Sequence, residues 1–300
     1  MSQVIILKKK IKKFNKQLNI PGDKSLSIRW ILFSSLASGV SKSRNLLISE
    51  DILAAINVIK KLGIKVILNK KFCKIYGKGM NGYKYKEDML LDAKNSGTLG
   101  RLILGLIINS SKKIKLIGDA SLSKRDFKRV TDPLSKFGAS FKMSKNNGLP
   151  LIMKGAKNLK PIKYIEKKGS AQCKSTVILA GMRTDGKTVI KAKKSRSHTE
   201  ILCKYLRLPL KVKSKKKFDL IEINKVKNIN PFNYNIPSDI SSASFFLALT
   251  ALSKNSKLLI KNVNINPNRI GIVSIFRKMG IVIKFKNKRI YKGEKIADIF

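Results

Sequence analysis

Residues 22–29, Gly-Asp-Lys-Ser-Leu-Ser-Ile-Arg, carry the pattern from which the fold of this chain is predicted. A glycine-containing turn places a lysine, two serines and an arginine at the start of an apolar helix. The unpaired amides and the dipole of a helix N-terminus favour anions, and Lys24, Ser25 and Arg29 add charge and donors there. We interpret this segment as a phosphate or carboxylate site. A serine in this position can also serve only as an N-cap.

The pattern recurs along the chain at a nearly fixed interval. Serines open four predicted helices at spacings of 71, 74 and 71 residues. These serines are Ser25, Ser96, Ser170 and Ser241. Three helix-ending glycines, Gly63, Gly138 and Gly280, keep the same period, at spacings of 75 and 142 residues. A fixed period indicates repeated supersecondary units.

Each unit is predicted to alternate helices with strands. In the first unit we predict helices over 25–38 and 50–62, and strands over 44–48, 65–68 and 73–76. In the second we predict a strand over 113–117, a helix over 124–137 and a strand over 139–143. In the fourth we predict a helix over 270–279 and strands over 257–260, 281–285 and 289–291. The proline-containing stretches at 20–22 and 235–238 are the predicted crossings between two domains, with three units between them.

Composition excludes several classes of protein. A chain of 300 residues with 43% hydrophobic content can bury a sizeable core, and its length suggests two domains. The sequence shows neither an apolar run long enough for a membrane span nor a signal peptide. Cys73, Cys173 and Cys203 have no metal-ligand spacing, which fits a reducing cytoplasm. His198 is the single histidine, so a histidine-based metal site or a Ser-His-Asp triad is excluded.

The net charge of +48 suggests nucleic acid, a membrane surface or phosphorylated small molecules as partners. The lysines are nevertheless spread along the chain, and lysine, isoleucine and asparagine are used heavily together, as AT-rich codons would cause. We therefore interpret the charge as a solvated surface and expect no specific nucleic-acid partner. Weak, salt-sensitive binding to polyanions is expected in either case.

Seven motifs, in order and at the repeat spacing, resemble those of the 5-enolpyruvylshikimate-3-phosphate synthase family. They lie at 21–29, 95–101, 118–125, 170–172, 196–200, 239–243 and 266–271. The resemblance implies an α/β fold of the α+β type, with repeated βαβαββ units in two domains that form an inside-out α/β barrel. It implies that 21–236 is a three-unit domain with most of the shikimate 3-phosphate contacts. Residues 1–20 and 237–300 would form an incomplete first domain.

The resemblance also implies an activity. This is transfer of the enolpyruvyl group from phosphoenolpyruvate to the 5-hydroxyl of shikimate 3-phosphate, with release of phosphate, in chorismate and aromatic amino acid biosynthesis. The family works as a cytoplasmic monomer, without a metal or organic cofactor and without a membrane. The two anionic substrates suit cationic side chains at helix N-termini.

Site residues are carried over from the same motifs. The resemblance assigns shikimate 3-phosphate binding to Lys24, Ser25, Arg29, Ser170, Ala171, Gln172 and Arg196. It assigns phosphoenolpyruvate binding to Lys24, Gly97, Arg125 and Gln172. We interpret Arg101 as structural, His198 as a local hydrogen-bonding residue and Asp239 as an N-cap.

The family's chains continue for about two units beyond the position of Phe300, and they carry their acid and base residues there. We therefore expect this chain to be truncated and inactive alone, and its catalytic residues stay unassigned. A lone fourth unit is also expected to leave an apolar face unburied. The alternatives are a UDP-N-acetylglucosamine enolpyruvyl transferase, a non-catalytic anion-binding remnant, half of a split enzyme with a separate C-terminal fragment, and a polyanion-binding protein.

Overall fold

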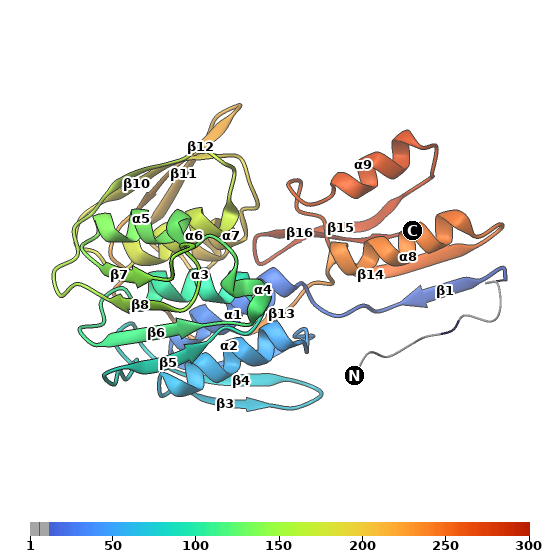
Figure 1. The fold of residues 1–300 in the computed structure, drawn as a ribbon. Coiled ribbons are helices and arrows are strands. Elements are labelled where there is room, and N and C mark those ends of the chain that lie inside the picture. The colour runs from blue at the N-terminus through green and yellow to red at the C-terminus, as the bar shows by residue number, and fades with distance from the viewer. Residues whose placement is uncertain (1–5, 7–11) are drawn as a thin grey trace. The chain divides into compact units, whose positions relative to one another are not determined.

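The computed structural model describes residue 6 and residues 12–300, which fall into two compact units (Figure 1). Unit 1 comprises the residues up to Pro21 together with Pro237–Phe300, and unit 2 comprises Gly22–Ile236. The chain passes from one unit to the other at Pro21 and again at Pro237. All the residues assigned above to substrate binding belong to unit 2.

Unit 2 contains three four-stranded sheets with one common plan. The first sheet has the order β13 (Tyr234–Asn235), β2 (Ser38–Arg44), β4 (Cys73–Lys78) and β3 (Lys65–Leu68). The second has the order β5 (Met89–Asp92), β6 (Lys113–Ile117), β8 (Leu151–Lys154) and β7 (Ser140–Met143). The third has the order β9 (Lys163–Glu166), β10 (Thr188–Lys193), β12 (Phe218–Ile223) and β11 (Leu210–Ser214). In each sheet the first pair is parallel and the other two pairs are antiparallel.

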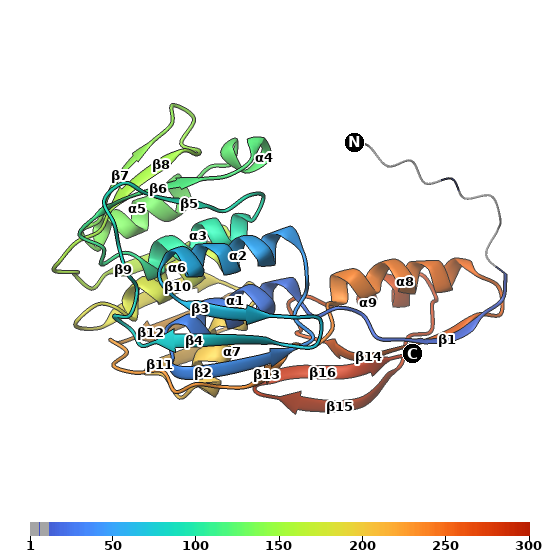
Figure 2. The same ribbon diagram turned by 90° about the horizontal axis from the view of Figure 1, so that it is seen from below.

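Three inner helices form the core of unit 2, with the sheets outside them (Figure 2). They are α1 (Lys24–Ser35), α3 (Gly97–Leu106) and α6 (Ala171–Gly181). Each is apolar or small on nearly every side and is buried along almost its whole length. The other helices of this unit are α2 (Glu50–Lys61), α4 (Ala120–Ser123), α5 (Lys128–Lys136) and α7 (His198–Tyr205).

Gly105 sets the distance between two of the inner helices. A Cβ atom at Gly105 on α3 would lie 2.4 Å from the carbonyl oxygen of Thr176 on α6, so only glycine allows this approach. The Thr176 hydroxyl donates in turn to the carbonyl of Arg101 at 3.0 Å. The two helices are therefore held together backbone to backbone.

Unit 1 has one sheet with the same plan, in the order β1 (Asn15–Leu18), β14 (Lys257–Asn264), β16 (Glu294–Ile299) and β15 (Phe285–Tyr291). Its helices are α8 (Ile240–Leu252) and α9 (Gly271–Lys278). The first strands are exchanged between the units, because β1 precedes α1 in the chain but pairs with β14. Likewise β13 precedes α8 but pairs with β2.

The helix caps correct the sequence prediction at two of four positions. Asp23, and not Ser25, caps α1, because its Oδ1 accepts from the amide of Leu26 at 2.9 Å. Asp239 caps α8, which agrees with the interpretation of Asp239 as an N-cap, so the helix does not open at Ser241. Ser96 and Ser170 cap α3 and α6, as predicted. The repeated feature is therefore the N-cap, whose four copies lie 73, 74 and 69 residues apart.

Several predicted elements were wrong. The strand predicted over 44–48 lies at Ser38–Arg44, where small serines such as Ser41 face the interior and hide the apolar alternation. The helix predicted over 124–137 begins later, at Lys128 as α5, and the separate short helix α4 precedes the predicted range. The segment 281–284 is not a strand, and β16 was not predicted at all.

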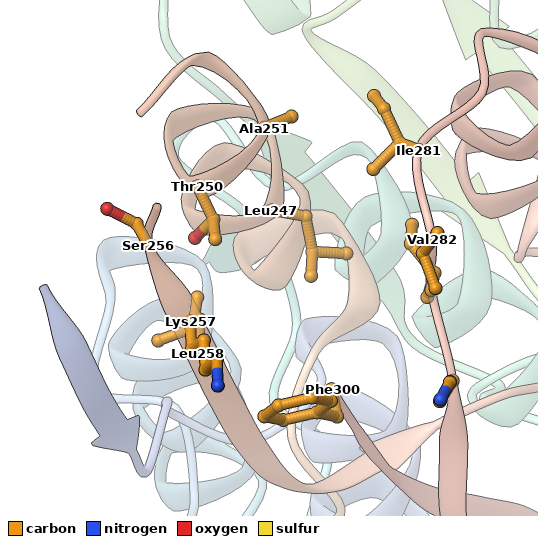
Figure 3. Close-up of a pocket in the computed structure, with 11 residues that line it drawn as sticks. Leu247, Thr250, Ala251, Ser256, Lys257, Leu258, Ile281, Val282 and Phe300 are labelled. Atoms are coloured by element: carbon orange, nitrogen blue, oxygen red, sulfur yellow. The ribbon is translucent and has the colours of Figure 1, made fainter. Parts of the chain in front are cut away.

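In unit 1 the apolar face of α8 stays exposed, as the sequence predicted. This helix has the apolar composition of the inner helices, yet Phe245 is 77% exposed and Leu252 is 86% exposed. Beside it lies an apolar pocket of about 260 Å³, between α8 and residues 281–284, with Leu258 and Phe300 among its lining residues (Figure 3).

Candidate functional site

The candidate site lies at the N-terminal turns of α1, α3 and α6. These turns are linked to one another and to the start of α7 by side-chain hydrogen bonds. Since each turn exposes unpaired amides, the repeat brings several anion-binding helix ends into one unit. Two clusters of polar side chains make up the site.

The first group, here called the Gly97 cluster, contains Asn95, Gly97, Arg101, Arg125 and Gln172. Arg125 Nη2 donates to Asn95 Oδ1 at 3.2 Å. A Cβ atom at Gly97 would lie 3.2 Å from Arg125 Nη1, so the guanidinium rests against the bare backbone of this glycine. The structure therefore brings together Gly97 and Arg125, which were both assigned to phosphoenolpyruvate.

Asp119 holds this cluster from outside. Its Oδ2 accepts from Asn95 Nδ2 at 2.5 Å, and its Oδ1 caps α4 by accepting from the amide of Leu122 at 2.7 Å. The backbone hydrogen bond from Leu122 lowers the pKa of Asp119, and the bond from Asn95 and the charge of Arg125 act in the same direction. A charged Asp119 thus orients Asn95, which in turn accepts from Arg125.

Gln172 is fixed from two sides. Its Oε1 accepts from Arg101 Nη1, and its Nε2 donates to Thr98 Oγ1 at 3.0 Å. Arg101 also donates from Nη2 to the carbonyl of Asp126 at 3.3 Å. Sequence reasoning interpreted Arg101 as structural, and the structure places it within this cluster, where it holds Gln172. Its position one helical turn after Gly97 puts both residues on the same face of α3.

Positive charge is concentrated around Arg101. Burial lowers the pKa of the Arg101 guanidinium, and the nearby charges of Arg129 and Arg125 lower it further, although Cys173 and Asp126 act in the opposite direction. Positive charges packed this closely favour a bound anion.

The second group, here called the Arg29 cluster, contains Ser25, Arg29, Ser175, Arg196 and Thr199. Arg29 is only 3% exposed, and it donates to Thr199 Oγ1 at 2.7 Å, to Ser175 Oγ at 3.1 Å and to the carbonyl of Ser25 at 3.0 Å. Arg196 Nη1 donates to Ser25 Oγ at 3.4 Å. The structure therefore brings together Ser25, Arg29 and Arg196, which were all assigned to shikimate 3-phosphate.

Ser175 and Thr199 are the members of the Arg29 cluster that sequence reasoning did not assign. Their hydroxyls lie 2.7 Å apart and tie α6 to α7 beneath Arg29. Ser175 follows Gln172 by three positions, which places both on one face of α6. This spacing was the available signal.

The remaining assigned residues are Ser170, Ala171 and Lys24. Ser170 caps α6, because its Oγ accepts from the amide of Cys173 at 3.3 Å, and Ala171 follows it as the first helical residue. Lys24 has a side chain that is 48% exposed, and its Nζ lies 3.5 Å from Asp51 Oδ2. Lys24 is the first residue of α1 and directly precedes Ser25.

Behind the site a buried ion pair joins α6 to α7. Lys174 Nζ lies 2.6 Å from Glu200 Oε1, and their side chains are 0% and 5% exposed. Burial raises the pKa of the neighbouring Cys203 thiol, which is therefore in the neutral form. His198 is also fully buried at the start of α7.

Among the residues that the structure describes, no group of three or more histidine, cysteine, aspartate or glutamate side chains is placed to hold a metal ion. No helix in residues 12–300 combines the length and the apolar character needed to cross a membrane.

Comparison with known proteins gives a consistent result. The sequence profile of the family described as EPSP synthase (3-phosphoshikimate 1-carboxyvinyltransferase) matches residues 8–298. The chain is 40% identical over 290 residues to a 3-phosphoshikimate 1-carboxyvinyltransferase of Caldicellulosiruptor saccharolyticus, which covers 96% of this chain and 66% of that protein. It is 40% identical over 294 residues to the protein of the same name from Sulfurihydrogenibium sp., with coverages of 97% and 68%.

Solved structures agree. An EPSP synthase from Acinetobacter baumannii superimposes with a TM-score of 0.86 at 34% sequence identity, over 96% of this chain and 64% of that one. The chain thus spans about two thirds of the length of the relatives that it matches.

Proposed function

The chain belongs to the EPSP synthase family, and we propose that it serves the transfer of the enolpyruvyl group from phosphoenolpyruvate to the 5-hydroxyl of shikimate 3-phosphate, with release of phosphate. The family membership rests on a match to nearly the whole chain.

One observation carries the proposal. The Gly97 cluster and the Arg29 cluster are separate sets of hydrogen-bonded cations, and α6 contributes to both, through Gln172 and Ser175. Two adjacent anion sites are what a reaction between two phosphorylated substrates requires, because the reacting groups must be held next to each other. The substrate assignments divide between the clusters in the same way, with Gln172 assigned to both substrates.

In the shikimate 3-phosphate site, Ser170 and Ala171 present the N-terminal amides of α6 to the phosphoryl group. Each such helix end contributes ~0.3–2 kcal/mol. Arg196 and Ser25, which are hydrogen-bonded to each other, add donors, and Gln172 offers its amide. Arg29 is buried and donates to the carbonyl of Ser25, and its positive charge favours an anion bound beside Ser25.

In the phosphoenolpyruvate site, Arg125 approaches the bare backbone of Gly97, which leaves room for an anion beside the first turn of α3. Arg125 can present two parallel donors to a carboxylate or phosphate. Lys24 lies at the start of α1 with an exposed ammonium group, and we assign to it a contact with both substrates.

Calorimetric titration of the purified chain with shikimate 3-phosphate tests this proposal. We expect saturable binding of one molecule per chain, weakened at least tenfold in an Arg196→Ala variant and unchanged in a Lys70→Gln variant, whose lysine lies in the exposed turn between β3 and β4. Absence of saturable binding, or equal affinity in the Arg196→Ala variant, would contradict the proposal.

A second titration separates the two acceptors within this class of enzyme. UDP-N-acetylglucosamine should fail to compete with shikimate 3-phosphate. If it competes at equal concentration, the proposed acceptor is wrong, and the chain is better interpreted as a UDP-N-acetylglucosamine enolpyruvyl transferase.

The proposal also covers the domain that binds the substrate, the oligomeric state and the cellular compartment. We propose that residues 21–236 carry most of the shikimate 3-phosphate contacts, since all seven assigned residues lie in unit 2. We also propose a monomer in the cytoplasm. The three cysteines are free and buried, which fits a reducing compartment. Light scattering of the purified chain tests the monomer, with a mass near 33.6 kDa as the expected result.

A further inference from the structure

A polar pocket of about 580 Å³ lies in unit 2, at the ends of α3 and α6 opposite to the candidate site. Asn109 follows the C-terminus of α3, and Met182 and Arg183 follow the C-terminus of α6. The first turns of these helices belong to the candidate substrate site. Since a helix of about ten residues spans ~15 Å, the two sites are separate.

The walls of this pocket carry an excess of positive charge. Lys157, Arg183, Lys225 and Lys227 line it, and Asp185 is its single acidic lining residue among the described residues. Both carboxylate oxygens of Asp185 accept from Lys225 Nζ at 2.8 Å. This pairing leaves the charges of Lys157, Lys227 and Arg183 uncompensated by any lining carboxylate.

Arg183 is the unusual member of this group. It is only 9% exposed, and Nη1 donates to the carbonyl of Met80, whereas Nε and Nη2 are buried without a hydrogen-bond partner in the described part of the chain. Its guanidinium lies 5.9 Å from the ring centroid of Tyr83, and no described carboxylate pairs with it. Burial lowers the pKa of Arg183, which reflects the cost of the unpaired charge.

The C-terminus of α6, which Arg183 follows, favours a cation. The buried Nε and Nη2 donors of Arg183 nevertheless lack hydrogen-bond partners among the described residues, and such unpaired buried donors are costly. The neighbouring side chains supply the other parts of an anion site. Lys157 and Lys227 are exposed lining residues, and Asn81 and Asn109 add amide donors. The volume is within the range of small-molecule sites.

We propose that this pocket binds a small phosphorylated anion. Lys157 and Lys227 contact the phosphoryl oxygens, and Arg183 supplies positive charge from below. Three uncompensated cations match a phosphoryl dianion better than a single carboxylate, so we expect phosphate to bind more tightly than acetate. The site is independent of the proposed transfer reaction.

Methionine-methyl NMR offers a local test, because Met80 and Met182 line this pocket whereas Met153 lies in β8. The purified chain, labelled with ¹³C-methyl methionine, is titrated with inorganic phosphate at constant ionic strength, with chloride as the replaced ion. We expect saturable shifts of the Met80 and Met182 methyl signals and none for Met153. Acetate should give an apparent dissociation constant at least fivefold higher.

Matched variants make the test specific. A Lys157→Gln/Lys227→Gln double variant should raise the apparent dissociation constant for phosphate at least tenfold. A Lys70→Gln/Lys71→Gln variant, which removes the same charge from an exposed turn, should leave it unchanged. The proposal fails if the Met80 and Met182 shifts do not saturate, if acetate binds equally well, or if both double variants behave alike.

Phosphate binding at the candidate substrate site is distinguished by an Arg125→Ala/Arg196→Ala variant. This variant should keep the full Met80 and Met182 response. Loss of that response would mean that the signals report the substrate site, and it would overturn the second-site proposal while leaving the proposed function intact.

Discussion

Arg101 on α3 donates from Nη1 to Oε1 of Gln172 on α6, and so joins the second repeat of unit 2 to the third inside the candidate site. Because the amide oxygen of Gln172 is held by Arg101, its Nε2 is directed to Thr98 at 3.0 Å. The orientation of a side chain assigned to both substrates thus depends on an arginine that contacts neither in the proposed scheme.

Replacement of Arg101 by glutamine should therefore weaken shikimate 3-phosphate binding. A hydrogen bond to a charged group contributes about 1.5–3 kcal/mol, so we expect a roughly 10–100-fold higher dissociation constant by calorimetry. Lys128→Ala, on the exposed start of α5, is the control and should bind as the unmodified chain does. An unchanged dissociation constant for the Arg101→Gln variant would show that Gln172 does not need this support.

Gly97→Ala should act on phosphoenolpyruvate alone. The new methyl group would lie 3.2 Å from Arg125 Nη1 and 3.5 Å from Leu122 Cδ1, so the flexible arginine has to move while the backbone stays in place. Titration with phosphoenolpyruvate in the presence of shikimate 3-phosphate should show weaker binding, with shikimate 3-phosphate affinity unchanged.

Gly271→Ala is a suitable control for that experiment, because a Cβ atom at Gly271 on α9 meets nothing within 4 Å. The interpretation is wrong if the Gly97→Ala variant binds phosphoenolpyruvate normally, or if both glycine variants lose affinity alike.

Two glycines of α3 should differ sharply in their tolerance of alanine. At Gly105 a Cβ atom would lie 2.4 Å from the carbonyl of Thr176, whereas at Gly100 its nearest neighbours, including Ala93, are 3.4 Å away. Overpacking costs about 1–3 kcal/mol, so Gly105→Ala should lower the free energy of unfolding in urea by that amount or more. Gly100→Ala should change it by less. Equal stabilities would contradict the close packing of α3 on α6.

Removing one member of the buried Lys174–Glu200 pair should lower the free energy of unfolding much more than removing both. Lys174→Met leaves a buried carboxylate alone, and such changes cost about 3–5 kcal/mol. A Lys174→Met/Glu200→Leu variant removes both charges and should recover most of the loss. Urea denaturation of the single and double variants measures this coupling. If the double variant is as unstable as the sum of both single variants, the two charges do not interact in the folded chain.

The repeat could be predicted from the sequence because helix caps and turns depend on local residue types, which recur at a fixed spacing. Ser96 and Ser170 accept hydrogen bonds from their own first turns, which are local contacts with a local signature. The first helix was predicted to open at Ser25, two residues after its actual N-cap Asp23, because serine and aspartate are both common N-cap residues.

Long-range features were harder to predict. The strand β2 carries serines on its buried side, and Ser41 is satisfied by the amide of Phe232, 191 residues away, which no local pattern reveals. Similarly, Ser175 and Thr199 meet beneath Arg29 from two helices. The resemblance assigned residues to substrate contacts, whereas the neighbours that hold those residues in place became visible only in the folded chain.

The most direct test of the account is a crystal structure of this chain with shikimate 3-phosphate. The account predicts density for the ligand in unit 2, with its phosphoryl group within hydrogen-bond distance of Ser170 and of either Ser25 or Arg196. A ligand bound elsewhere, or an empty site at saturating concentration, would contradict it.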